Sequence, residues 1–125
     1  MRKIKITAAG VTAVAELNDS PTADAIWKAL PIEATGSTWG DEIYFSIPVR
    51  LEEASDAKEV VNVGDLGYWP PGHAFCIFYG RTPASVGNEV RPASAVNVFG
   101  HIVGDATIFK KARGSVRVRV EPLVE

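Results

Sequence analysis

The chain has 125 residues, a formal net charge of −2 and 46% hydrophobic residues, which is the profile of one globular domain spanning residues 1–125. So small a net charge provides no field that attracts polyanions, and no segment has the roughly 20 apolar residues of a membrane helix, so neither nucleic acid nor a membrane is an expected partner. The single cysteine, Cys76, excludes an internal disulfide, and a cytoplasmic location fits this cysteine content best.

Alternating apolar and polar residues at the start of the chain predict a β-hairpin, with strands over residues 3–7 and 11–17. A helix is expected next, near residues 21–30. It begins after Ser20, a favourable N-cap residue, and it ends at Pro31 because proline cannot continue a helix.

Most of the remaining chain predicts further strands. Alternating or wholly apolar residues place these strands over residues 43–49, 59–63, 75–79, 95–103 and 116–121. A second short helix is expected near residues 105–112, because Asp105 is an N-cap residue and the lysines that follow suit a helix C-terminus. Roughly seven or eight strands, without regular strand–helix alternation, predict a mainly β fold: a closed antiparallel barrel with two short capping helices.

Residues 64–83 contain five aromatic residues, four glycines and three prolines around one wholly apolar strand. Glycine and proline favour turns, and Tyr and Trp present large apolar faces with a polar tip. This combination is typical of a segment that lines a groove. Trp69 is expected at the rim of that groove, because the following Pro70, Pro71 and Gly72 cannot continue a central strand.

Several segments resemble the cyclophilins. Residues 14–22 are similar to the passage from hairpin to helix in that family, residues 98–104 to its Val-Phe-Gly-x-Val phrase, and residues 72–77 to a Gly-Ser-Gln-Phe-Phe-Ile-like strand. Three further segments resemble, more specifically, a small and mostly uncharacterised prokaryotic family with an atypical cyclophilin-like barrel: residues 38–46, 67–72 and 92–97. The resemblance implies a cyclophilin-like barrel over nearly the whole chain.

The resemblance implies prolyl cis/trans isomerase activity only where the residues of that activity are present. The family's Phe-His-Arg phrase falls near Ile43, Tyr44 and Phe45, which supply no cation. The glutamine that holds the substrate in cyclophilins aligns with Ala74, and only the aromatic floor at Phe75 is retained. Because twisting an amide requires oriented donors, we expect weak isomerase activity at best.

Eight residues are candidates for a ligand-binding site: Glu42, Tyr44, Tyr68, Trp69, Phe75, Phe78, Arg81 and Asn97. For Phe75 and Phe78 the barrel core is favoured over the groove, since aromatic residues dominate cores. Arg81 is either a carboxylate-binding residue or a member of a surface ion pair. Asn97 interrupts an apolar strand, so its side chain either points outward or needs buried partners. Glu42 is either an acid–base group or a turn residue.

No metal site and no cofactor are expected, because His73 and His101 lack neighbours with the spacing of metal ligands. The apolar neighbours of Cys76 predict a buried, unreactive thiol. Two functions are compatible with these residues. The first is a binding protein that holds a small molecule or peptide in an aromatic groove without efficient prolyl isomerase activity. The second is an enzyme with residual isomerase or another activity.

Overall fold

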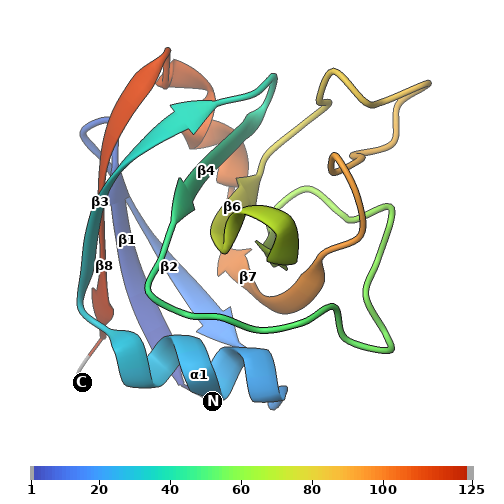
Figure 1. The fold of residues 1–125 in the computed structure, drawn as a ribbon. Coiled ribbons are helices and arrows are strands. Elements are labelled where there is room, and N and C mark those ends of the chain that lie inside the picture. Colours follow the sequence, from blue (N-terminus) through green and yellow to red (C-terminus); the bar gives the residue numbers. More distant parts are fainter. Residues whose placement is uncertain (1, 124–125) are drawn as a thin grey trace.

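Eight strands form the framework of the computed structural model, which describes residues 2–123 (Figure 1). Their bounds are β1 (Lys3–Ala8), β2 (Val11–Leu17), β3 (Ile32–Thr38), β4 (Glu42–Ser46), β5 (Asp65–Trp69), β6 (Ala74–Phe78), β7 (Asn97–Val103) and β8 (Ser115–Pro122). The strands close into a barrel in the order β1-β2-β7-β5-β6-β4-β3-β8, with β8 pairing back to β1. The closed antiparallel barrel expected from the sequence is confirmed.

Three short helices accompany the barrel: α1 (Pro21–Ala29) and the 3-10 helices η1 (Pro70–Gly72) and η2 (Ala106–Lys111). The hydroxyl of Ser20 accepts a hydrogen bond from the Ala23 amide at 3.1 Å, which is the N-cap that the sequence predicts for α1. This helix crosses one end of the barrel in Figure 1, and η2 lies near the other end. Both expected capping helices are present, the second as a 3-10 helix.

The strand predicted for residues 59–63 is wrong. Of these residues only Val61 is buried, and it forms one isolated bridge with Val90. Conversely, β3 and β5 are not among the strands that the sequence patterns predict. In β3 the residues that alternate are small or polar, so the hydrophobic signal of a strand is weak.

The interior of the barrel is filled by aromatic and aliphatic side chains. At its centre the ring of Phe75 stacks on Phe45 with ring centroids 4.8 Å apart, and the edge of Phe99 approaches it at 4.9 Å. Ile77 of the same strand is also fully buried in this core. Because successive side chains of a strand point to opposite faces, the alternate residues Ala74, Cys76 and Phe78 lie on the outside of the barrel.

A second apolar cluster covers this outer face, and it explains why every residue of β6 is buried. Cys76 and Phe78 project outward there and pack with Val90 and Val96 from the segment that follows β6. Gly67 on the neighbouring strand admits this segment, since a Cβ at position 67 would lie only 2.7 Å from Cγ2 of Val96. The segment between β6 and β7, residues 79–96, therefore folds over one outer face of the barrel, and we call this segment the wall.

Candidate functional site

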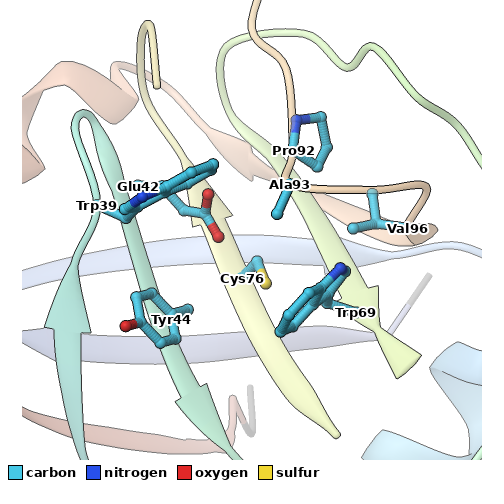
Figure 2. Close-up of a pocket in the computed structure, with 8 residues that line it drawn as sticks. All are labelled: Trp39, Glu42, Tyr44, Trp69, Cys76, Pro92, Ala93 and Val96. Atoms are coloured by element: carbon cyan, nitrogen blue, oxygen red, sulfur yellow. The ribbon is translucent and has the colours of Figure 1, made fainter. Parts of the chain in front are cut away.

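The wall and the outer face of the barrel enclose an open pocket of about 290 Å³, which we call the outer pocket (Figure 2). Its lining comes from the turn before β4, from strands β4, β5 and β6, and from the wall: Trp39, Glu42, Tyr44, Trp69, Cys76, Pro92, Ala93 and Val96. Figure 2 shows Trp39 and Tyr44 on one side of the pocket and Trp69 opposite them, with the carboxyl of Glu42 and the sulfur of Cys76 between.

Strand register brings these side chains together. Tyr44 of β4 and Gly67 of β5 both stand opposite Cys76 of the central strand β6. Paired residues of neighbouring strands share a face, and residues two apart along one strand do as well, so Glu42, Tyr44 and Cys76 all point outward. The glycine opposite Cys76 lets Val96, which also lines the pocket, pack directly against the sheet.

Trp69 is half-buried and held in place at both ends of its indole. The indole Nε1 donates a hydrogen bond of 2.7 Å to the hydroxyl of Ser94 in the wall. The ring lies against Gly72, where a Cβ would come within 2.9 Å of two ring carbons. Glycine at this position and proline at the two preceding ones thus give the indole a fixed orientation at the pocket edge.

Glu42 is the unusual polar group of the outer pocket. Its side chain is almost completely buried, with 5% exposure, and its Oε1 has no hydrogen-bond partner. Burial raises the pKa of Glu42 to about 7, and the neighbouring thiol of Cys76 opposes part of this increase. The carboxyl is therefore about half ionised at neutral pH.

Cys76 is a buried free thiol beside this carboxyl. Burial raises its pKa well above the usual value, and the negative charge of Glu42 adds to the increase. The thiol is consequently protonated at neutral pH, which is the state that the sequence predicts for an unreactive cysteine. Its polar neighbour Glu42, rather than Cys76 itself, is the group that changes charge near pH 7.

The lining of the outer pocket contains no Lys, Arg or His. Arg91 precedes the lining residue Pro92 but pairs with Glu89, its Nε lying 3.0 Å from the carboxylate. Arg81 is exposed and donates a 3.4 Å hydrogen bond to the carbonyl oxygen of Ser85. Neither arginine supplies a positive charge to the pocket.

Three of the eight predicted site residues line the outer pocket: Glu42, Tyr44 and Trp69. Tyr68 and Phe75 instead lie inside the barrel, and Phe78 lies fully buried in the outer apolar cluster. The hydroxyl of Tyr68 donates to the carbonyl oxygen of Val49 at 2.6 Å and accepts from the amide of Leu51 at 3.1 Å. It anchors the chain after β4 to the core.

Asn97 lines a separate cavity of about 380 Å³ between the start of α1 and the loop at residues 51–56. Its Oδ1 accepts from the amide of Ala54 at 2.8 Å, and its Nδ2 donates to the carbonyl oxygen of Glu52 at 3.0 Å and to Thr22 at 3.3 Å. These bonds satisfy the buried amide. Asn97 thus holds the loop against the helix and the barrel.

Five lining residues are not among the predicted site residues: Trp39, Cys76, Pro92, Ala93 and Val96. A signal for Cys76 exists in the alternation of the strands, whereas Trp39 lies in the turn between β3 and β4 and has none. Once Tyr44 is placed in a groove, the residue that pairs with it on the next strand must face the same groove. The wall residues carry no such signal, because a loop has no fixed period.

Within the described residues, none of the helices reaches the length and hydrophobicity of a membrane span. Across residues 2–123 there is also no group of three or more His, Cys, Asp and Glu side chains arranged to hold a metal ion. The chemistry of the outer pocket therefore rests on aromatic faces and on one buried carboxyl group.

The sequence model of the family described as Cyclophilin-like matches residues 2–121, and the chain therefore belongs to the Cyclophilin-like family. Among solved structures, the chain is similar to the solution structure of a hypothetical protein from Archaeoglobus fulgidus, with 40% sequence identity and a TM-score of 0.82. This similarity covers 98% of the present chain and 95% of the archaeal chain. No curated protein matches the chain. The family expected from the sequence motifs is confirmed.

Proposed function

We propose that this protein binds a small molecule or a short peptide segment in the outer pocket, in the cytoplasm, without efficient prolyl isomerase activity. One observation carries the proposal: an open, mostly apolar pocket is lined by Trp39, Tyr44 and Trp69 together with the carboxyl of Glu42, one oxygen of which is buried without a partner. Binding sites for small ligands are typically concave and apolar, with a few polar groups that fix orientation.

The rigidity of the lining supports binding. Two tryptophans and a tyrosine offer large contact areas with few rotatable bonds. These side chains therefore lose little conformational freedom when a ligand binds. Trp69 is already fixed by Ser94 and Gly72. The wall is also closed on itself, because the hydroxyl of Thr82 donates to the carbonyl oxygen of Arg91 across the loop.

Thermal-shift screening of small apolar and aromatic compounds tests this function. We expect the stabilisation by any compound that binds in the pocket to disappear in the Tyr44→Ala, Trp69→Ala double variant. Trp27→Ala is the matched control. Trp27 belongs to α1, where Arg2 lies over its ring, and it does not line the pocket. A compound that still stabilises the double variant binds elsewhere, and a screen with only such compounds contradicts the proposal.

The composition of the pocket does not favour prolyl isomerisation. The barrier to rotation of a peptide bond is about 20 kcal/mol, and lowering it requires donors aimed at the amide. The lining has no cationic side chain, and its carboxyl Glu42 and thiol Cys76 are weak substitutes. We expect a protease-coupled isomerisation assay at micromolar protein to show no rate above background.

A second candidate function is enzymatic, and the carboxyl of Glu42 favours it. A pKa of about 7 suits a general acid–base group at neutral pH, and such shifts are frequent in active sites. Incubating each compound found in the screen with the protein and following it by mass spectrometry distinguishes an enzyme from a binding protein. An enzyme would form product, and the Glu42→Gln variant would not.

A further inference from the structure

We infer that the ligand of the outer pocket carries a positively charged organic ammonium group, which Glu42 pairs with between the aromatic faces. This inference rests on the proposed binding function and specifies its ligand class. It starts from the one buried side-chain oxygen among the described residues that lacks a hydrogen-bond partner. Oε1 of Glu42 is buried without a hydrogen bond, and no ion pair among the described residues involves this carboxyl.

A buried carboxyl with a free acceptor requires a donor, and a charged donor satisfies it best. An ionised carboxylate out of water is costly unless an opposite charge compensates it. The described residues provide no such charge, because no basic side chain lines the pocket and Arg91 is already paired with Glu89. A cationic ligand would supply the missing charge and the missing hydrogen bond together.

The aromatic lining points to the same ligand class. Trp and Tyr rings attract cations through their negatively polarised faces, and Trp does so most strongly. In Figure 2 the rings of Trp39, Tyr44 and Trp69 surround the carboxyl from two sides. The cation–π contact found among the described residues lies elsewhere, between Arg2 and Trp27, so the rings of the pocket hold no protein cation. An anionic ligand would meet a carboxyl and aromatic faces without any compensating charge.

Three probes of the same shape test the inference: benzylammonium, benzyl alcohol and benzoate, titrated at pH 8 and followed by tryptophan fluorescence or calorimetry. We expect the wild-type protein to bind benzylammonium at least about tenfold more tightly than benzyl alcohol, and benzoate most weakly. The preference for benzylammonium over benzyl alcohol should fall below about twofold in Glu42→Gln. It should persist in Glu53→Gln, a matched control because Glu53 is exposed and outside the pocket.

A pH titration of binding supplies a second readout on the unmodified protein. Lowering the pH from 8 to 6 protonates Glu42, so the affinity for benzylammonium should fall about tenfold while that for benzyl alcohol stays constant. The other groups that interact with Glu42 are Cys76 and Tyr79. The pKa of each is raised, that of Tyr79 to about 12, so neither changes charge in this range.

The outcomes separate the inference from the proposed function. If benzyl alcohol binds as tightly as benzylammonium or more tightly, and Trp69→Ala abolishes this binding, the inferred preference for an ammonium group is wrong. The proposed binding function of the outer pocket is then still supported. No measurable binding of any of the three probes would overturn both. A lysine side chain presents the same group, so Nα-acetyl-lysine amide is a fourth probe. Preferential binding of either cation supports the inference, and their relative affinities distinguish a free amine from a peptide.

Discussion

Replacing Glu42 by glutamine should make the protein more stable at high pH relative to the wild type. The carboxyl has a pKa of about 7 in the folded protein and close to 4.5 in the unfolded chain, so the folded state holds the proton more tightly. Between these two values the unfolded state is ionised while the folded state is not. Wild-type stability from this group is therefore present at low pH and is lost as the pH rises from about 4.5 to about 7.

The size of the effect follows from the two pKa values of Glu42. At about 1.4 kcal/mol per pH unit, a displacement from 4.5 to about 7 corresponds to roughly 3 kcal/mol, most of it between pH 5 and pH 8. Glutamine does not ionise, so the Glu42→Gln variant lacks this loss. The stability difference between variant and wild type should therefore grow by about 2 kcal/mol from pH 5 to pH 7 and level off by pH 8, where the carboxyl is ionised in both states.

Chemical denaturation of both proteins at pH 5, 6, 7 and 8 measures that difference. Other carboxyls, such as that of Glu89, whose pKa is lowered to about 2 by hydrogen bonds from the Val86 and Gly87 amides, are the same in both proteins and cancel. The side-chain change itself also shifts the free energy of unfolding by an amount that does not depend on pH. This constant shift does not bear on the prediction. A difference that stays within about 0.5 kcal/mol across the whole range would refute a buried, uncompensated carboxyl.

Three further outcomes are expected. Trp69→Ala should lower the free energy of unfolding by about 2 kcal/mol in denaturation experiments, because the indole is half-buried and bonded to Ser94, and a loss well above 3 would make Trp69 a core residue. Gly67→Ala should cost about 1–3 kcal/mol and weaken ligand binding, since its Cβ would displace Val96 from the pocket wall; unchanged stability would contradict the close contact. Cys76 should react slowly with an aromatic disulfide reagent in the native protein and rapidly after denaturation, because the thiol is 2% exposed and its pKa is raised, so rapid native labelling would disprove its burial.

The barrel was predictable from the sequence because its terminal strands alternate strongly. Val116, Val118 and Val120 face the core in β8, and Arg117 and Arg119 between them are exposed. Strand β3 was not predictable in the same way. Its exposed side chains are polar and its inward ones small, so its identity depends on pairing with β8 along its whole length, which local periodicity does not reveal.

The candidate site was only partly predictable, because aromatic content does not determine the direction of a side chain. Tyr68 and Trp69 are neighbours on one strand and therefore cannot both face the same pocket. The same parity separates Phe75 from Phe78. A wholly apolar strand gives no indication of which face is inside, and only the register with Tyr44 on β4 decides it.

The division of β6 between two faces has a consequence for how this barrel could be adapted. Phe75 and Ile77 hold the interior together, whereas Cys76 belongs to the pocket floor and Ala74 and Phe78 to the outer cluster beside it. Substitutions on the outer face leave the interior packing untouched, since the backbone of the strand separates the two sets. Specificity for new ligands is thus open to variation, by selection or in the laboratory, on a scaffold whose interior is packed by other residues.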